Sequence, residues 1–521
     1  MSYLTRHQRE ANLYYALVDT LLGKMESFYE SIPESMGNLL LDAAKEVRRA
    51  KRVFAFSHID ADGISALAII SLMLEREEKE FEWKNVHQIN SESIVQIEED
   101  VRKYKPNLVI FSDFGTGQMS LIEKHILSIE DVDSVIVLDH HLPTNGIAEP
   151  TQDNTPSKLI EVNPHQHGMS GSYDLSGAGT AFLLALFVSL NNVDLSELAI
   201  VGATGDLQDY YGRGFVGLNK EIVELGGSSG FLEVMRDLTF FGIHTRPLPY
   251  LLQYATDPYL PGLTGAEDAC YAFFQDLDID MRSGDEWRVW VDLESSEKQR
   301  AIQGIIQVVL EHYNDPRVAQ GIIGDTIVLS QRPPKTEMRS AKEFSTLLNA
   351  CGRNRRPEVG VRVCMGDPEA FTEGKTLLQQ HRANLASALR RLEEEGYTEM
   401  QGMYVVNDPQ TPDTIIGIVI GMAQGSMIIP TDRPVIGIST NTTDDSPLAK
   451  LSGRAHKRLV ERGVNLKEVF VEVADILNEK NETLIAEAGG HPMAAGAFIQ
   501  KSHLDEFLDL ASSKLAKRLG R

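Results

Sequence analysis

The stretch that decides the fold is RVFAFSHIDADGISALAII, residues 52–70. Its apolar run VFAF is typical of a short buried strand, and the polar run from Ser57 to Gly63 follows directly. From Ile64 the chain continues as ISALAIISLMLEREEKE, an apolar run with a charged end that predicts a helix. A strand, a polar turn and a helix in this order are the first unit of a sheet whose faces are covered by helices.

The same alternation recurs along the next part of the chain. Strands are predicted at NLVIFSD (107–113), SVIVLDHH (134–141) and LIEVN (159–163), and helices at MSLIEKHILSIE (119–130) and GAGTAFLLALFVSLNN (177–192). Strands that alternate with helices imply a parallel sheet, in which ligands bind beyond the carboxyl ends of the strands. We therefore expect an α/β fold with a parallel sheet.

Acidic and imidazole side chains follow the predicted strands at their carboxyl ends. They occur in Ser57-His58-Ile59-Asp60-Ala61-Asp62-Gly63, at Asp113, in Asp139-His140-His141, and at Asp206 after the helical run LSELAIVGATG. Crowded carboxylates are unfavourable without a counter-charge, and two divalent cations would supply it. Oxygen ligands with one or two imidazoles suit Mn²⁺ or Mg²⁺.

Each of these residues, taken singly, also fits an ordinary structural role. Asp113 could cap a turn or helix, and Asp60 and Asp62 could be turn residues before Gly63. The agreement of three consecutive strand ends is what favours a metal site.

The composition limits the range of partners and compartments. The 521 residues suggest about three domains. A net charge of −25 argues against non-specific coating of duplex nucleic acid, although a local basic groove or bound cations could still attract phosphates. The three cysteines form no CxxC pair, which fits a reducing cytoplasm, and no apolar run is long enough for a membrane span.

Six motifs resemble those of a known superfamily. SHIDADGISALAI (57–69), FSDFG (111–115), LDHH (138–141) and GATGDLQD (202–209) resemble the four N-terminal motifs of the DHH phosphoesterases, in family order. LSGRA (451–455) and AGGHPMAAGA (488–497) resemble the DHH-associated C-terminal domain. This pairing resembles the RecJ branch of single-strand exonucleases, and AKEFSTLLNACGR (341–353) is similar to the archaeal RecJ-like group.

The resemblance implies a role for each motif residue. Two ions, Mn²⁺ or Mg²⁺, would be held by six side chains: His58 and Asp60 on one ion, Asp62, His140 and Asp206 on the other, and Asp113 bridging both. His141 would bind or polarise the scissile phosphate, and Asp139 would orient a histidine. Substrate phosphates would contact five residues of the C-terminal domain: Ser452, Arg454, Gly489, Gly490 and His491.

Five segments are expected along the chain. They are an N-terminal helical segment (1–50), a DHH catalytic domain (51–245), an irregular and helical connector (246–315), an α/β insertion (316–398) and a smaller α/β DHH-associated substrate-binding domain (399–521). The connector is expected to begin with an irregular proline- and glycine-rich stretch at 246–265.

These expectations lead to three hypotheses about function. The first is a two-metal exonuclease on single-stranded DNA, with RNA as an alternative, acting in replication or repair; the resemblance implies 5′ to 3′ polarity. The second is a phosphodiesterase of short oligonucleotides or cyclic dinucleotides. The third is a scaffold associated with the replicative helicase through proteins such as GINS. The presence of every expected ligand favours retained catalysis.

Two weaker signals stay open at this stage. Gly177-Ala178-Gly179 opens a helix as a phosphate-binding loop does, but it lacks the full GxGxxG pattern and also fits a tightly packed helix start. Arg353, Arg355 and Arg356 form a small basic cluster, which fits either a solvated turn or a nucleic-acid contact.

Overall fold

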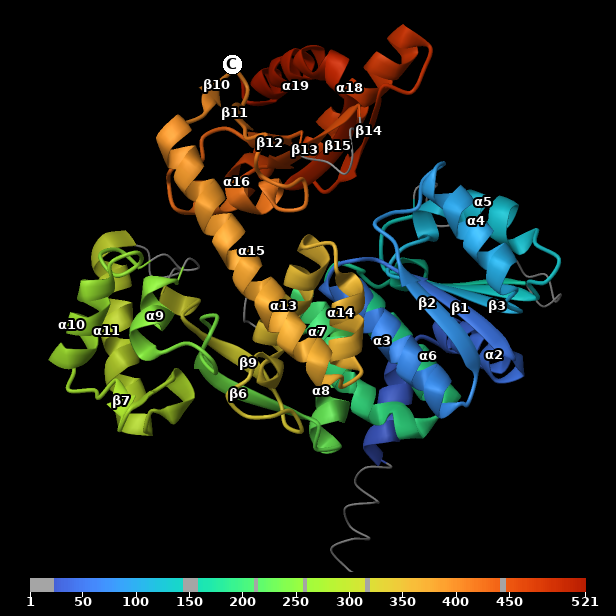
Figure 1. Ribbon diagram of the computed structural model, residues 1–521, viewed down its shortest axis with the longest axis horizontal. Helices are drawn as coiled ribbons and strands as arrows, with labels where there is room; N and C mark the ends of the chain where they lie inside the picture. Colours follow the sequence, from blue (N-terminus) through green and yellow to red (C-terminus); the bar gives the residue numbers. More distant parts are fainter. Residues whose placement is uncertain (1–22, 144–157, 210–213, 256–259, 314–318, 441–446) are drawn as a thin grey trace, which may run out of the picture. The chain divides into compact units, whose positions relative to one another are not determined.

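The structure is a computed structural model, and it describes residues 23–143, 158–209, 214–255, 260–313, 319–440 and 447–521. The chain forms two compact units, residues 1–378 and residues 379–521 (Figure 1). The expected helical residues before position 23 lie outside the described part. Residues 23–31 are helical and lead into α2.

The first unit is built on a five-stranded sheet in the order β2-β1-β3-β4-β5. Its strands are β1 (Arg52–Ser57), β2 (Glu80–Asn85), β3 (Leu108–Ser112), β4 (Ser134–Leu138) and β5 (Leu159–Val162). Every neighbouring pair is parallel, which confirms the predicted parallel sheet. Ser57 pairs with Ser112, Ser112 with Leu138, and Leu138 with Val162, so four strands end level with one another.

Helices cover both faces of this sheet, as the period-two alternation of its strands requires (Figure 1). Val53 and Ala55 pack on one face with α2 (Glu34–Arg49), α3 (Ala61–Arg76), α6 (Gly177–Val188) and α7 (Ser196–Gly205). Phe54 and Phe56 pack on the other with α4 (Ser93–Tyr104) and α5 (Met119–Ile122), which continues into a π-helical turn (Glu123–Leu127).

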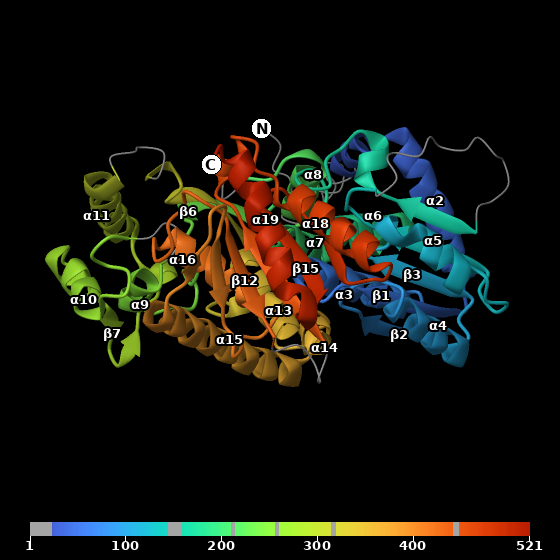
Figure 2. The same ribbon diagram turned by 90° about the horizontal axis from the view of Figure 1, so that it is seen from above.

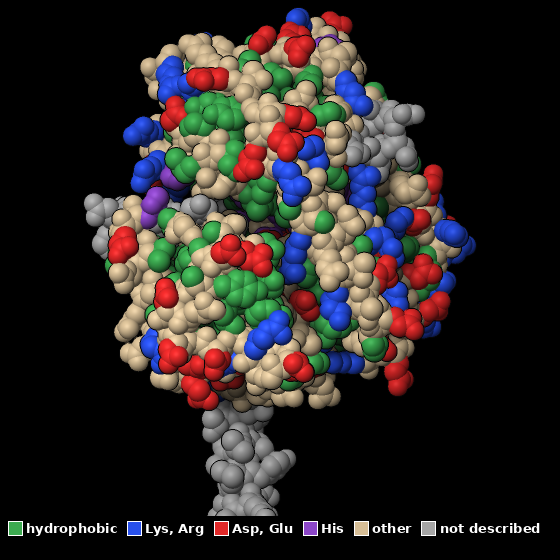
Figure 3. All heavy atoms as spheres, turned by 60° about the vertical axis from the view of Figure 1, so that its left-hand side comes forward, with side chains coloured by type: hydrophobic (Ala, Val, Ile, Leu, Met, Phe, Trp, Pro, Cys, Tyr) green, Lys and Arg blue, Asp and Glu red, His purple; other side chains and the backbone are tan. Residues whose placement is uncertain are grey.

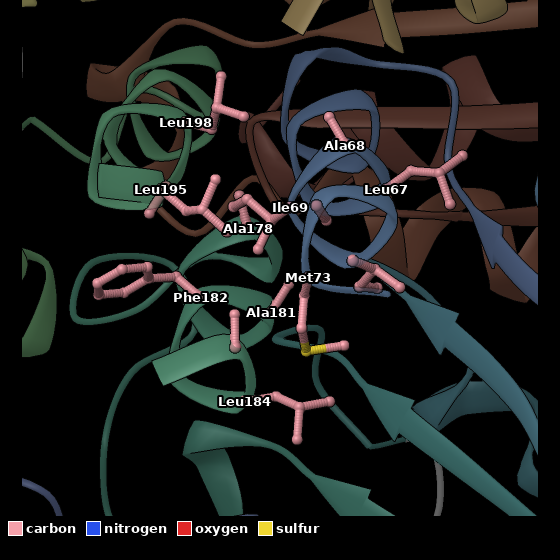
Figure 4. Close-up of a cluster of buried hydrophobic side chains, with 14 of the residues drawn as sticks. Leu67, Ala68, Ile69, Met73, Ala178, Ala181, Phe182, Leu184, Leu195 and Leu198 are labelled. Atoms are coloured by element: carbon pink, nitrogen blue, oxygen red, sulfur yellow. The ribbon is translucent and has the colours of Figure 1, made fainter. Parts of the chain in front are cut away.

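Helices α3, α6 and α7 meet in a core of mixed large and small side chains (Figure 4). Met73 of α3 points toward α6, and Ala68, Ala178 and Ala181 let the backbones approach. Phe182 points from α6 away from α3 and packs edge-on against Phe28 of the helical residues 23–31. Because α3 and α6 are apolar on nearly all sides, they are buried helices rather than amphipathic surface helices. This core fixes the helix starts that lie at the carboxyl edge of the sheet.

The rest of the first unit packs beside this core. Helix α8 (Gly217–Ser228) leads to the antiparallel pair β6 (Leu232–Leu238) and β9 (Ile323–Leu329). The residues between these two strands in sequence form a subdomain with its own core around Trp290. Its elements are α9 (Leu248–Gln253), α10 (Glu267–Asp276), β7 (Arg282–Ser283), β8 (Glu286–Trp287) and α11 (Ser295–Tyr313). After β9 come α13 (Ala341–Arg353), α14 (Pro357–Cys364) and α15 (Pro368–Glu395), of which residues 368–378 belong to this unit.

The second unit is a six-stranded mixed sheet in the order β10-β11-β12-β13-β15-β14. Its strands are β10 (Thr398–Glu399), β11 (Tyr404–Asn407), β12 (Val435–Ser439), β13 (Leu448–Arg454), β14 (Ala486–Gly490) and β15 (Ala494–Gln500). Helices α18 (Leu466–Asn481) and α19 (Leu504–Arg518) cover one face (Figure 2). Helix α16 (Ile416–Gly425) packs on the other, and α17 (Lys457–Val460) follows β13.

The structure differs from the sequence reading in three elements. The helix predicted to run to Glu80 ends at Arg76. The following residues EFEWKN form the edge strand β2, in which exposed and partly buried side chains alternate, and its charged residues resemble those of a helix end. The stretch 246–265, expected to be irregular, contains α9. The C-terminal domain, expected from the sequence to end in two helices, has two strands, β14 and β15, between α18 and α19.

Two further observations concern the chain as a whole. Among the residues that the structure describes, no helix combines the length and the apolar character of a membrane span. Cys270, Cys351 and Cys364 are buried and unpaired, so packing rather than disulfide bonding holds the cores together.

Replacing Phe182 by alanine tests whether the core around α6 stabilises the first unit. The ring is fully buried, so Phe182→Ala should lower the free energy of unfolding by about 3–5 kcal/mol. Denaturant unfolding followed by circular dichroism measures the change. Leu41→Ala on α2, where 47% of the side chain is exposed, is the control and should change it by less than about 1 kcal/mol. Equal effects of the two substitutions would contradict this assignment of the core.

Candidate metal centre

The level strand ends bring the predicted polar residues to one edge of the sheet. His58, Asp113 and Asp139 each follow directly after the last residue of β1, β3 and β4. Asp206 arrives from another direction, at the end of α7. Three groups of these side chains lie close enough to share an ion: His58, Asp60 and Asp113; Asp62, His140 and Asp206; and Asp113, His140 and His141.

The first group forms around His58. Its Nδ1 lies 2.9 Å from Asp60 Oδ2 and 3.5 Å from Asp113 Oδ2. The other oxygen of Asp60 accepts a hydrogen bond from the Gly63 amide at 3.1 Å and so caps α3. Asn85 on β2 donates to the His58 carbonyl at 2.7 Å. The cap and the edge strand therefore hold this group from both sides.

The second group forms around His140. Its Nε2 lies 3.2 Å from Asp113 Oδ1, 3.3 Å from Asp206 Oδ2 and 3.6 Å from Asp62 Oδ2. Asp113 thus presents Oδ2 to one group and Oδ1 to the other. It does so from a backbone φ of +61°, a conformation that residues other than glycine rarely adopt and that clusters at functional sites.

A network that the sequence did not reveal orients His140. Its Nδ1 lies 2.5 Å from the Gly171 carbonyl, which leaves Nε2 to face the carboxylates. Gln208 also donates to that carbonyl at 2.8 Å, and Asn219 on α8 donates to Gln208 Oε1 at 2.6 Å. Gln208 is 1% exposed and lies in the motif that contains Asp206, but nothing in the sequence pairs it with Gly171.

The helix start Gly177-Ala178-Gly179 binds a carboxylate of the protein itself. The amides of Gly177 and Ala178 donate to the two oxygens of Asp62 at 2.6 and 3.0 Å. This is the chemistry by which helix starts bind anions, with Asp62 in the place of a phosphate. The tightly packed helix start is therefore the interpretation that the contacts support.

Glycine is required where helices meet this carboxylate. A Cβ on Gly202 of α7 would lie 2.4 Å from Asp62 Oδ1 and 2.5 Å from the Cβ of Ala178. A Cβ on Gly171 would lie 1.7 Å from the His140 carbonyl oxygen. Side chains at either position would push the acidic and imidazole groups apart.

Asp139 and His141 form a pair beside the second group. Asp139 is fully buried, and its Oδ1 lies 2.8 Å from His141 Nδ1. Its Oδ2 accepts from the Thr116 amide at 2.9 Å. Although burial raises the pKa of Asp139, the charge of His141 lowers it well below its usual range. Burial lowers the pKa of His141, but Asp139 raises it above its ordinary value.

The charges of the cluster are unbalanced without cations. Burial, together with the charges of Asp113 and Asp206, raises the pKa of Asp62 well above its usual range. Burial and the neighbouring carboxylates raise the pKa of Asp206 to about 7, against the effect of His140. Burial alone would lower the pKa of His140, but the carboxylates raise it well above the ordinary value. The cluster therefore holds protons where a cation would otherwise balance the charge.

The donor set fits divalent cations. Asp113 Oδ2 is buried and accepts no hydrogen bond from the residues that the structure describes, so it has a coordination position to offer. The three candidate groups contain only carboxylates and imidazoles. Oxygen-rich sets with imidazole suit Mn²⁺ and Mg²⁺, and no thiolate is present among them to favour a softer metal.

A cavity of about 300 Å³ adjoins the first group. It is lined by His58, Asp113, Asp139, His141 and Leu142, by 87–89 after β2, and by 114–115 and 117–118 after β3. Ligand pockets begin at roughly this size. The cavity lies within the first unit, next to the side chains that the motifs identified.

The predicted substrate-binding residues lie in the second unit. Ser452 and Arg454 are on β13, and a Cβ on Gly417 would lie 3.2 Å from Ser452 Cβ and 2.8 Å from Arg454 Nη2. Both side chains therefore face α16. Gly489 pairs with Gly496, which also pairs with Ser452 on the other side.

His491 and Gly490 stand at the end of β14. The His491 amide donates to the Ala494 carbonyl at 2.8 Å, which closes the hairpin to β15. Lys450, two residues before Ser452 on the same strand, belongs to the same face by alternation, and the sequence reading did not name it.

The basic cluster divides into different environments. Arg356 pairs with Glu373 at 2.7 Å and with Glu358, as a solvated turn would. Arg353 lies close enough to Asp60 for its charge to lower the pKa of that carboxyl, together with the effect of His58 and against that of burial. Arg353 is thus connected with the metal centre through its charge.

Comparison with protein families identifies three segments. Residues 52–204 match the DHH family N-terminal domain, residues 240–322 the DHH-CID domain, and residues 401–517 the DHHA1 domain. Together they cover most of the chain. The first contains the metal-centre motifs up to His141, and Asp206 lies two residues beyond its end; the third contains the motifs of the second unit.

Similar proteins and structures extend over nearly the whole chain. Uncharacterized protein MJ0831 of Methanocaldococcus jannaschii is 29% identical over 466 residues, 89% of this chain and 93% of the relative. RecJ from Thermus thermophilus, solved with Mn²⁺, has a TM-score of 0.55 at 17% identity over 93% of this chain; the match spans 55% of that protein, just over half its length.

Two further structures match in full length. An exonuclease RecJ bound to manganese has a TM-score of 0.51 at 17% identity and covers 92% of this chain and 94% of its own. CDC45 from Entamoeba histolytica has a TM-score of 0.58 at 12% identity. The match covers 94% of this chain and 98% of the CDC45 chain. At these identities the likeness establishes a shared fold.

Proton release on Mn²⁺ binding tests the electrostatics of the cluster. Because the pKa of Asp206 is raised to about 7, this carboxyl holds a proton below that pH, and an ion must displace it. Apparent Mn²⁺ affinity should therefore rise as pH increases from about 6 to about 8, by up to about tenfold per pH unit for each proton displaced. Calorimetry in two buffers of different ionisation enthalpy counts the protons. Affinity that stays constant across this range would contradict the prediction.

Proposed function

We propose that this chain, which belongs to the DHH superfamily, is a two-metal phosphodiesterase of the RecJ-like branch that removes nucleotides from single-stranded DNA. Members of the superfamily are generally phosphoesterases, so a hydrolase is the expected class. RNA is the second substrate to consider. The proposal places the reaction in DNA replication or repair and in a reducing cytoplasm, which the unpaired cysteines favour.

The observation that carries the proposal is the position of Asp113 between two ligand groups. His58 and Asp60 lie on its Oδ2 side, and His140 on its Oδ1 side together with Asp62 and Asp206. One shared carboxylate between two groups is the arrangement that a pair of Mn²⁺ or Mg²⁺ ions needs. When bound, such ions activate water and neutralise charge on the transferred phosphoryl group.

The protein's own side chains would position the substrate. His141 lines the cavity, and Asp139 holds its Nδ1, so Nε2 remains for a phosphate oxygen. Asp139 raises the pKa of His141 against the effect of burial, which favours the protonated imidazole, and a protonated imidazole donates a charge-assisted hydrogen bond. Asp139 in turn is fixed by backbone amides, which limits rotation of the pair.

The second unit would contribute phosphate-binding groups. Ser452 offers a hydroxyl and Arg454 a guanidinium on one face of β13, and Gly489, Gly490 and His491 form the neighbouring hairpin end. The chain has a net charge of −25, and on the face in Figure 3 basic and acidic side chains are interspersed. Binding of a nucleic-acid backbone would therefore depend on local groups such as these.

Two other functions remain candidates. The cavity of about 300 Å³ would also suit a short oligonucleotide or cyclic dinucleotide. The structural likeness to CDC45 is the reason to consider the other candidate, a scaffold role in a replicative helicase assembly with GINS-type partners. A scaffold does not need metal ligands, and here all six expected ligands are present and close together, which favours catalysis.

Digestion of end-labelled substrates tests the proposal. Single-stranded DNA and RNA of several lengths, with Mn²⁺, Mg²⁺ or chelator, should show metal-dependent release of mononucleotides, with long DNA cleaved at least as well as dinucleotides. Asp113→Asn should lower the rate on the order of 1000-fold, because neither ion keeps its shared ligand.

Asp131→Asn is the matched control, because this carboxylate is exposed and lies in the same domain. It should hydrolyse at the wild-type rate. A folded Asp113→Asn protein with wild-type activity would exclude the assignment. Cleavage of cyclic dinucleotides or dinucleotides alone would favour the small-substrate alternative.

Arg454→Ala tests the role of the second unit. Loss of a charged phosphate contact should raise KM for single-stranded DNA by about tenfold, leave kcat nearly unchanged and weaken the salt dependence of binding. Arg458→Ala, at an exposed position on α17, is the control and should have little effect. A KM equal to that of wild type would remove Arg454 from the substrate-binding residues.

A further inference from the structure

Helix α13 packs against the metal-binding loop although it lies outside all three matched family segments. Asn349, Gly352 and Arg353 are three and four residues apart, so they share one face of this helix. That face contacts the loop from Ile59 to Ala61. A segment about 290 residues away in sequence is thus part of the wall of the first ligand group.

Asn349 makes the direct contact. Its Oδ1 accepts a hydrogen bond from the Ala61 amide at 3.0 Å. Ala61 is the first residue of α3, and its amide is one of the donors that a helix start leaves unsatisfied. Asp60 caps the same turn through the Gly63 amide. The two acceptors therefore divide the first turn of α3: Asp60 from within the loop, and Asn349 from α13.

Gly352 makes the closest approach. A Cβ at this position would lie 1.9 Å from the Ile59 carbonyl oxygen. Ile59 stands between the two expected ligands His58 and Asp60. Any side chain at 352 would therefore displace the backbone that carries both ligands.

The other end of α13 is fixed to the start of the 240–322 subdomain. Glu343 is 1% exposed and accepts from the His244 amide at 3.0 Å and from the Thr245 hydroxyl at 2.5 Å. Lys342 donates to the Thr239 carbonyl at 2.7 Å. The helix is thus held along its length and can transmit its position to the loop.

We infer that Asn349 is a positioning residue for the metal centre, and that it acts by holding the His58–Asp60 loop at the geometry that the first divalent cation requires. The inference rests on the proposed two-metal function. Asn349 itself does not contact the ligand atoms. Its effect would reach the ion through the Ala61 amide and the first turn of α3, with Gly352 keeping the loop and the helix in contact.

A purely structural role for Asn349 would give a different result. Its loss would then lower the thermal stability of the first unit and leave metal affinity as it is. Metal affinity measured on the folded, full-length protein separates the two roles, because it does not depend on turnover.

The test is titration of the full-length protein with Mn²⁺ alone, followed by calorimetry and by electron paramagnetic resonance of the bound ion. Wild type should bind two ions. Asn349→Ala should weaken one of the two sites by about tenfold or more, the range expected when an outer partner of a ligand is lost. Asn349→Asp, which keeps an oxygen acceptor at the same reach, should restore binding. Gly352→Ala should weaken the same site at least as much.

Asn354→Ala is the matched control. This residue is on the turn that ends α13 and donates to the carbonyls of Ala350 and Leu377, not to the loop. It should change melting temperature without changing Mn²⁺ affinity. If Asn349→Ala binds both ions like wild type, the inference is wrong even though the proposed function stands. If wild type binds no Mn²⁺, the proposed function itself fails.

Discussion

Repulsion among buried carboxylates is the constraint on which the rest of the structure depends. Asp62 and Asp113 are almost fully buried and lie with Asp60 and Asp206 around two imidazoles. Such a cluster is stable only if the surrounding fold holds it and if protons or cations balance its charge. The repulsion raises the pKa of Asp206, and the backbone amides that donate to Asp62 stabilise its carboxylate against the repulsion.

Two features of the backbone bring the acidic and imidazole side chains together. A parallel sheet whose strands end level supplies three of the polar segments at one edge, without any long-range signal beyond strand pairing. Helix starts and glycines then bring the remaining groups close: α6 donates amides to Asp62, and Gly202 lets α7 approach it. The strained backbone of Asp113 stands where the two ligand groups meet, and it is the residue whose two oxygens face different neighbours.

Much of the sheet and the motif residues could be predicted because their signals are local. An apolar run followed by a carboxylate is visible within ten residues, as for Asp113 after β3. The strand β2 was missed because an edge strand with alternating charges has the same composition as a helix end. The roles of Gln208 and Asn349 depend on contacts over 37 and 288 residues, respectively, and no short-range pattern contains that information. The ligand roles remain predictions that metal binding must test.

The position of α13 bears on how catalytic and scaffold proteins could share one fold. The sheet and its core do not depend on the ligands, since Phe182 and its neighbours pack without them. The ligand geometry, in contrast, depends on parts outside the sheet: Gly171 and Gln208 for His140, and α13 for the loop of Asp60. A relative could therefore lose its ions by small changes in these supports and keep its fold and surfaces. In this chain the expected ligands and the groups that support them lie together, as the proposed metal-dependent hydrolysis requires.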